Sequence, residues 1–113
     1  MSGETKLILQ KYVNELVNIY GSHLQTVILY GSYARGDYNA DSDIDILILL
    51  DLKDEEVKGY RHKLTDVTFD YNMDFGLDIK PLAKSKEHFE KWILAYPFYS
   101  NINKEGVKLF DVA

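Results

Sequence analysis

The chain lacks several features that mark particular classes of protein. It contains no cysteine, which excludes disulfide bonds and thiolate metal sites. Its longest uninterrupted apolar stretch, Ile46 to Leu50, is far too short to cross a bilayer, so no membrane association is expected. The N-terminus has no signal-peptide layout, which favours a cytoplasmic protein.

Positive charge is also in short supply. Lys and Arg number 13 against 18 Asp and Glu, which gives a net charge of -5. We therefore expect no non-specific binding to nucleic acid, and any phosphate must be met locally by a metal ion and a few placed donors. With 113 residues, 46% of them hydrophobic, the chain is expected to form one domain over residues 1–113.

Apolar periodicity predicts three main helices. Residues 4–20 and 54–75 repeat apolar side chains at helical spacing, and Gly21 is expected to stop the first of these helices. Ser85 suits the N-cap of a third helix, which is expected to run to residue 95. The remaining tail predicts a short helix, a turn at Glu105–Gly106 and a last short strand.

Short apolar runs between these helices predict strands at residues 26–30, 44–50 and 77–82. The run at 44–50 is apolar on both faces, which is typical of a central strand. Pro81 limits the run at 77–82 to an edge or to a late position in the strand, because proline donates no ladder hydrogen bond. The resulting fold class is α/β (α+β), with a small mixed β-sheet flanked by helices.

The segment from residue 31 to residue 50, GSYARGDYNADSDIDILILL, carries most of the functional information. Asp43 and Asp45 enter its apolar run two residues apart, so both carboxylates are expected on one face of a strand. Adjacent carboxylates repel each other unless a cation lies between them. Mg²⁺ prefers such oxygen ligands, and the pair therefore predicts a metal site.

The start of the same segment suits a phosphate. Gly31 permits a sharp turn and a close backbone approach. Ser32 supplies a hydroxyl, and the N–H groups that follow can open a short helix aimed at an anion. Arg35 is a charged donor one turn further on, suited to a terminal phosphate.

Simpler interpretations remain open for these residues. Gly31 and Ser32 could be turn residues only, and Arg35 could form a surface ion pair with Asp37 or Asp41. Ser42 is included among the nucleotide-binding candidates, although a loop residue that orients the following aspartate would look the same.

Taken together, the Gly-Ser, Ala-Arg-Gly and Ser-Asp-Ile-Asp elements resemble the nucleotidyltransferase superfamily that includes DNA polymerase beta and kanamycin nucleotidyltransferase. Within it, GSYARGDYNADSDID is most similar to the minimal nucleotidyltransferases and their GSxARGxxxxxSDID pattern. The order of predicted elements extends this resemblance over most of the chain. The resemblance implies a polymerase beta-like nucleotidyltransferase fold.

The resemblance also implies a third carboxylate from a neighbouring strand, often the general base for the incoming hydroxyl. Asp70, Asp74 and Asp78 are the candidates, and Asp78 is favoured because it lies in the predicted strand at 77–82. We expect Asp78 to be catalytic and to share the metal with Asp43 and Asp45. Lys80 would share its face, either as a phosphate contact or as an ordinary strand-edge lysine.

The function implied by the resemblance is a Mg²⁺-dependent transfer of AMP from ATP, with one or two metal ions. The acceptor would be a tyrosine hydroxyl of a HEPN-type toxin, for which the chain would be the antitoxin. Two alternatives remain: a non-catalytic antitoxin that binds its partner through the aromatic C-terminal half, and a small-molecule adenylyltransferase whose substrate site forms in a dimer. A homo-oligomer is a possible assembly of the chain.

Overall fold

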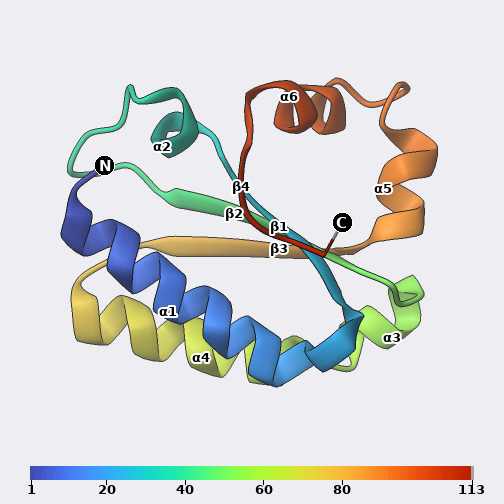
Figure 1. Ribbon diagram of the computed structural model, residues 1–113, viewed down its shortest axis with the longest axis horizontal. Helices are drawn as coiled ribbons and strands as arrows, with labels where there is room; N and C mark the ends of the chain where they lie inside the picture. The colour runs from blue at the N-terminus through green and yellow to red at the C-terminus, as the bar shows by residue number, and fades with distance from the viewer. Residues whose placement is uncertain (113) are drawn as a thin grey trace.

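The computed structural model describes residues 1–112, and its centre is a four-stranded mixed β-sheet with the order β3-β2-β1-β4 (Figure 1). The strands are β1 (Leu24–Tyr30), β2 (Ile44–Leu50), β3 (Ile79–Ser85) and β4 (Val107–Asp111). β2 pairs with β1 antiparallel and with β3 parallel, and β4 pairs antiparallel with the other side of β1. The expected mixed sheet, with the strand at 44–50 inside it, is confirmed.

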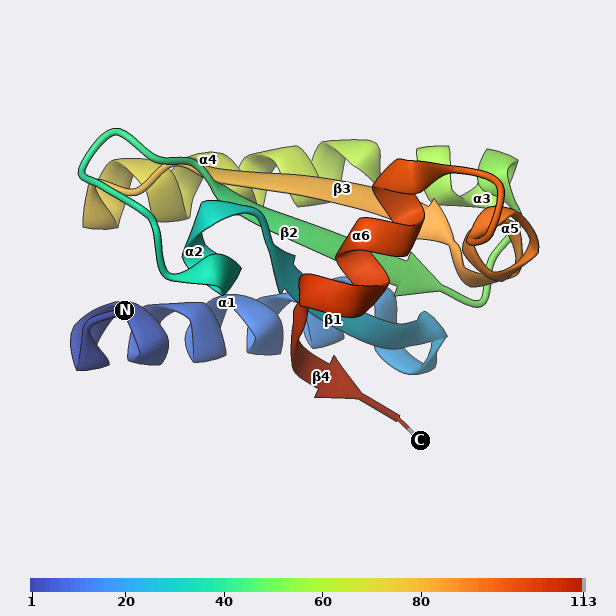
Figure 2. The same cartoon turned by 90° about the horizontal axis from the view of Figure 1, so that it is seen from above.

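Helices cover the two faces of this sheet. Two long helices lie side by side over one face, and shorter helices lie over the other (Figures 1 and 2). The long helices are α1 (Gly3–Tyr20) and α4 (Arg61–Phe75). The elements of the other face and the connections are η1 (Gly21–His23), α2 (Ser32–Arg35), α3 (Asp54–Lys58), α5 (Lys86–Trp92) and α6 (Pro97–Glu105).

The alternation of side chains along β2 explains why both faces need cover. Ile46 and Ile48 belong to the core beneath α1 and α4, together with Tyr12 and Leu16 of α1. Leu47 belongs to a separate core formed with residues of α5 and α6. Both faces of β2 are therefore buried, as its continuous apolar sequence predicts.

The first predicted helix is confirmed within one residue at its start, and Gly21 ends it with a φ of 58°. The single helix predicted over 54–75 is wrong, because the chain forms α3 and α4 with Gly59 and Tyr60 between them. Glycine costs about 1 kcal/mol relative to alanine inside a helix. Tyr60 meanwhile packs its ring 5.0 Å from that of Tyr20, and this tertiary contact turns the chain where periodicity alone continues.

The third strand is an edge strand, as Pro81 allows, but it runs over 79–85 instead of 77–82. Ser85 caps α5 by accepting a hydrogen bond of 3.3 Å from the His88 N–H, as expected. α5 ends at Trp92, before the predicted residue 95. The short helix, the Gly106 turn and the last strand of the tail are all present.

Candidate active site

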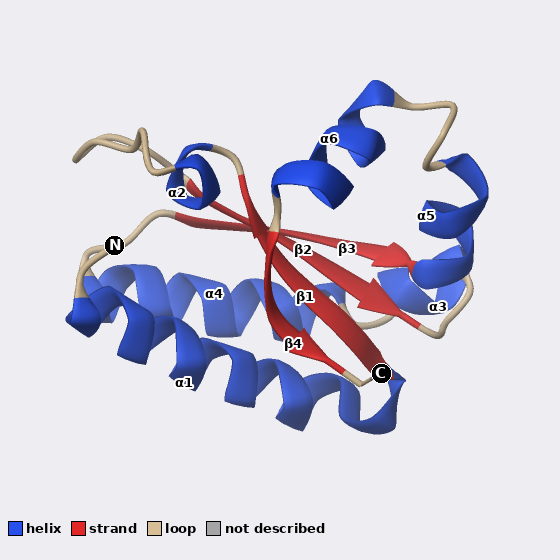
Figure 3. Cartoon of the chain, turned by 45° about the horizontal axis from the view of Figure 1, so that its top comes forward, coloured by secondary structure: helices blue, strands red, loops and turns tan. Residues whose placement is uncertain are grey.

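The topology brings three separate parts of the sequence to one end of the sheet (Figure 3). β1 leaves the sheet at Tyr30 at this end, and the parallel strands β2 and β3 both begin here, at Ile44 and Ile79. The Ile44 N–H donates a 2.9 Å hydrogen bond to the carbonyl of Asp78, which fixes the two strand starts side by side. Residues on either side of this link are therefore neighbours in space.

Gly31 forms the turn that leads out of β1. Its φ of 72° lies in the left-handed region, and a Cβ at this position would overlap the Asp45 carboxylate. Glycine is therefore needed both for the backbone conformation and for the close approach of Asp45. The carbonyl of Gly31 accepts hydrogen bonds of 3.1 Å from the N–H groups of Ala34 and Arg35, which start the single turn of α2.

The three predicted carboxylates interact electrostatically. A hydrogen bond with Asp78 lowers the pKa of Asp43, and the ammonium of Lys80 acts in the same direction. The same hydrogen bond raises the pKa of Asp78, with desolvation and the negative charge of Asp43 adding to it. Burial raises the pKa of Asp45, and the charge of Asp43 raises it further. The sheet thus concentrates negative charge at the ends of two strands.

Lys80 is the cation that partly offsets this charge. Its Nζ lies 3.5 Å from Oδ2 of Asp43, and both side chains are substantially exposed. The register of the parallel pair, in which Asp45 lies opposite Lys80, puts the lysine on the same face as the carboxylates. The sequence left Lys80 open as a phosphate contact or as an ordinary strand-edge lysine. In the structure Lys80 lies on an edge strand, and its side chain contacts the Asp43 carboxylate.

The carboxylates suit a hard divalent cation by their chemistry. Within residues 1–112 no three acidic or histidine side chains are already gathered closely enough to enclose a metal ion. Asp43, Asp45 and Asp78 nevertheless offer only oxygen donors and share one end of the sheet, and the negative charge of Asp43 raises the pKa of both Asp45 and Asp78. The donor set and its unbalanced charge fit Mg²⁺.

Arg35 lies on α2 next to this acidic group and makes two exposed ion pairs. Its Nε is 3.3 Å from Oδ2 of Asp37, one of the two aspartates that the sequence offered as surface ion-pair partners. Its Nη1 is 3.7 Å from Oε2 of Glu105, at the end of α6. The second pair could not be found from the sequence, since 70 positions separate the two residues.

Ser42 and two tyrosines shape the loop before β2. The Ser42 hydroxyl accepts a 2.9 Å hydrogen bond from the Asn39 N–H, so it organises the loop that delivers Asp43. Tyr33 and Tyr38 stack with ring centroids 4.3 Å apart and nearly parallel planes. Tyr33, Ser42 and Asp78 also line a cavity of about 270 Å³ beside the carboxylates.

Asp70 and Asp74, the other candidates for the third carboxylate, lie exposed on α4. Neither is among the groups that act on the pKa of Asp43, Asp45 or Asp78. Among the three acids, the geometry brings only Asp78 next to Asp43.

None of the helices formed by residues 1–112 is long and apolar enough to cross a membrane.

The sequence was also compared with known families and proteins. The profile of a family described as "Nucleotidyltransferase domain" matches residues 9–108. Two proteins of Methanocaldococcus jannaschii, both named "Putative protein adenylyltransferase", are similar in sequence. One is 36% identical over 110 residues, covering 90% of this chain and 94% of its own length. The other is 33% identical over 79 residues, covering 70% and 78% respectively.

Solved structures share the fold. A structure from Sulfolobus solfataricus, described as a "putative nucleotidyltransferase", superimposes with a TM-score of 0.64 at 19% identity, covering 95% of this chain and 80% of its own. Another, described as a "toxin-antitoxin with AMP-PNP", gives a TM-score of 0.53 at 18% identity, covering 91% and 73%. The family match spans most of the chain, including the carboxylates and the Gly31 turn. The chain is a nucleotidyltransferase and belongs to the nucleotidyltransferase domain family.

Proposed function

We propose that this chain is a Mg²⁺-dependent protein adenylyltransferase that moves AMP from ATP onto a tyrosine hydroxyl of a HEPN-type toxin, and so acts as its antitoxin. The observation that carries the proposal is the arrangement at the end of the sheet. There the Gly31 turn approaches Asp45 closely, and the pairing of the Ile44 N–H with the Asp78 carbonyl puts Asp78 beside Asp43. A phosphate-binding turn beside a set of carboxylates is what nucleotidyl transfer requires.

Asp43, Asp45 and Asp78 would hold one or two Mg²⁺ ions. Bound Mg²⁺ would supply charge neutralisation at the phosphate oxygens. Gly31 has no side chain, which lets the Asp45 carboxylate lie directly against the turn where the phosphates would bind. Ser32 would donate its hydroxyl to a phosphate oxygen, along with the first N–H groups of α2, which have no partner within the helix.

Arg35 would bind the terminal phosphates after leaving its present partners. Its side chain is 46% exposed, and the carboxylates of Asp37 and Glu105 are at least as exposed. Exposed ion pairs contribute about 0–1 kcal/mol, so exchanging them for a triphosphate costs little. Ser42 would contribute indirectly, by holding the loop before Asp43.

Asp78 would act as the general base. Its hydrogen bond with Asp43 raises its pKa toward neutrality, where a base is most effective at cellular pH. The hydroxyl oxygen of the acceptor forms a bond to the α-phosphorus of ATP, and the hydroxyl proton passes to Asp78. The bond between the α-phosphorus and the bridging oxygen breaks, and pyrophosphate leaves.

A partner protein is proposed as acceptor because of what the similar proteins are. The Methanocaldococcus jannaschii relatives are named protein adenylyltransferases. One similar structure is a toxin–antitoxin complex with AMP-PNP, an ATP analogue, and another is a mutant of such a complex. We also propose that residues 1–113 form one cytoplasmic domain, whose acceptor comes from the partner.

The test is incubation of the purified chain with α-labelled ATP, Mg²⁺ and the HEPN-type protein encoded beside it. Label should appear on the partner, and mass spectrometry should locate one or more AMP groups on tyrosine. A chelator should abolish labelling. The Asp43→Asn/Asp45→Asn variant should transfer no label, whereas Asp70→Asn/Asp74→Asn, with the same change of charge on α4, should label normally.

Three results would contradict the proposal. Toxin neutralisation without any label, unchanged in the Asp43→Asn/Asp45→Asn variant, would show a non-catalytic antitoxin. Nucleotide-modified metabolites without labelled protein would show a small-molecule adenylyltransferase. Loss of labelling in Asp70→Asn/Asp74→Asn, with Asp78→Asn active, would place the third carboxylate on α4.

A further inference from the structure

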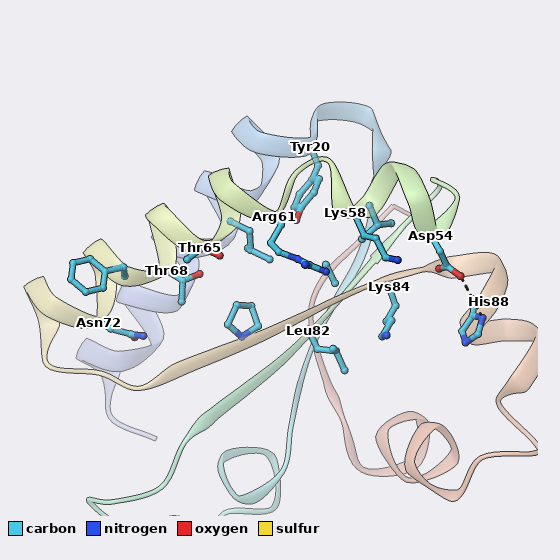
Figure 4. A pocket seen from close by; sticks show the side chains of 15 residues that line it. Tyr20, Asp54, Lys58, Arg61, Thr65, Thr68, Asn72, Leu82, Lys84 and His88 are labelled. Atoms are coloured by element: carbon cyan, nitrogen blue, oxygen red, sulfur yellow. Dashed lines mark ion pairs between the residues drawn. The ribbon is translucent and has the colours of Figure 1, made fainter.

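A second hollow lies away from the carboxylates, between the free edge of β3 and the helices α3 and α4 (Figure 4). It has a volume of about 740 Å³, within the range of roughly 300–1,000 Å³ that small-molecule sites occupy. None of the proposed catalytic or phosphate-binding residues lines it. Much of its wall is apolar, with contributions from Val57, Leu64, Pro81 and Ala83.

Three cationic side chains line this hollow and form no ion pair within residues 1–112: Arg61, Lys58 and, on β3, Lys84. Figure 4 shows the Arg61 guanidinium extending from the start of α4 into the space, with Lys58 of α3 beside it. Asp54, the acid on the wall, pairs with His88 at 3.8 Å. In a chain of net charge -5, three cations around one hollow without counter-charges are notable.

A buried hydroxyl belongs to the wall of the same hollow. Tyr20 is 3% exposed, and its hydroxyl is the one buried side-chain polar atom in residues 1–112 without a hydrogen-bond partner. In Figure 4 its oxygen end is directed toward Arg61. A buried polar group without a partner costs about 1–3 kcal/mol, so native proteins seldom leave one unless a water or ligand completes it.

We propose that this hollow is a binding site for a small organic phosphate ester, separate from the transfer site. Arg61 and Lys58 bind the phosphate group, and the Tyr20 hydroxyl donates to one of its oxygens. The apolar wall accommodates the organic part of the ester. A ligand with an organic part is proposed because a bare phosphate would leave most of the volume unfilled. The proposal does not depend on the transfer reaction.

The test uses ¹⁵N-labelled protein in the presence of EDTA, which keeps metal-dependent nucleotide binding at the carboxylates out of the measurement. Amide spectra are followed during titration with AMP, ribose 5-phosphate and phenyl phosphate, and with inorganic phosphate for comparison. At least one ester should give saturable shifts at Arg61, Thr65 and Ala83. Inorganic phosphate should bind more weakly than that ester.

Matched variants sharpen the result. Arg61→Gln should weaken binding about tenfold, as expected for loss of a charge-assisted hydrogen bond. Lys63→Gln removes the same charge two residues along α4, outside the hollow, and should leave the affinity unchanged. Tyr20→Phe should weaken binding while leaving the free protein at least as stable, because it removes an unsatisfied hydroxyl and keeps the ring.

Four outcomes would overturn the proposal. The first is that none of the three esters shifts the amide signals of the hollow. The second is that the shifts are confined to residues 31–45. Equal weakening in Arg61→Gln and Lys63→Gln would indicate non-specific charge attraction. If poly-glutamate alone perturbs the hollow, its ligand is an acidic protein segment and not a small ester.

Discussion

The two faces of the sheet differ in how completely they are covered. Beneath α1 and α4, 15 buried residues form one continuous core, whereas the face under α5 and α6 has a core of six. The thinner side leaves large apolar side chains in solvent, among them Leu94 at 96% exposure, with Tyr96 and Phe98 close to half exposed. The helices of the first face also expose apolar side chains, such as Phe69 and Met73 of α4, so the two faces differ in the size of their cores and in the aromatic surface around α6 that a partner could contact.

The candidate active site belongs to the thinner side. Asp45 lies on the same face of β2 as Leu47 and Leu49, because side chains two residues apart in a strand point to the same side. Its carboxylate therefore faces the layer of α5 and α6. Arg35 reaches the end of α6 through Glu105. An acceptor that docks on the exposed aromatic surface would thus approach the carboxylates from the side where the proposed reaction occurs. The larger core and the candidate active site therefore lie on opposite faces of one sheet.

The largest expected effect separates chemistry from stability. Asp43→Asn/Asp45→Asn should lower the rate of AMP transfer about a thousandfold or more, since the charges that act on the transition state are lost. The free energy of unfolding should change by less than about 1 kcal/mol, because the exposed Asp43–Lys80 ion pair that is lost is weak and repulsion on Asp45 is relieved. Single-turnover labelling and urea denaturation measure the two quantities. A marked loss of stability would show that the acids are structural.

The face covered by α1 and α4, called the thick face here because it has the larger core, should contribute most of the stability. Leu16→Ala, at a fully buried position of α1, should cost about 2–5 kcal/mol of unfolding free energy. Leu94→Ala, at an exposed position after α5, should change it by less than about 0.5 kcal/mol. Partner binding should show the opposite order: among folded proteins, Leu94→Ala should weaken binding more than Leu16→Ala does. Equal destabilisation by both substitutions would remove the distinction between the faces.

Alkaline pH should act on the thick face through two tyrosines. Burial raises the pKa of Tyr20 to about 12 and that of Tyr12 well above its ordinary value. Because the folded-state pKa is raised, their contribution is complete below about pH 10, the unfolded value, and is lost as pH rises through 12. Urea denaturation across this range should show the decline, and Tyr20→Phe should make it shallower. An identical pH profile in Tyr20→Phe would exclude its contribution.

The smallest effect concerns the exposed pair between α2 and α6. Glu105→Gln should lower the unfolding free energy by less than about 1 kcal/mol. It should also lower the KM for ATP modestly, because Arg35 is released from one competing carboxylate. Steady-state transfer at varied ATP gives the readout, with Glu90→Gln, on α5, as a charge-matched control. A raised KM would mean that Glu105 orients Arg35 productively.

Elements whose limits are set by local pattern follow from the sequence, whereas elements whose limits are set by tertiary contacts do not. The strand at 44–50 and the helix ended by Gly21 were predicted because apolar spacing and a glycine stop act locally. The prediction of a single helix failed at Gly59 and Tyr60, where a tyrosine contact to α1 breaks a periodic segment into two helices. The strand at 77–82 was misplaced because its pairing with β2, not its own composition, sets its limits.

By itself, the sequence determined the proposed metal and phosphate side of the site, since the Gly31 turn and the pair Asp43 and Asp45 lie within one segment whose spacing is a local property of the chain. Only the tertiary structure decided that Asp78 and Lys80 meet this segment, because that depends on the parallel pairing of β2 with β3. The same holds for the hollow at Arg61. Its walls come from three distant segments, and no sequence pattern encodes which distant side chains will face one space.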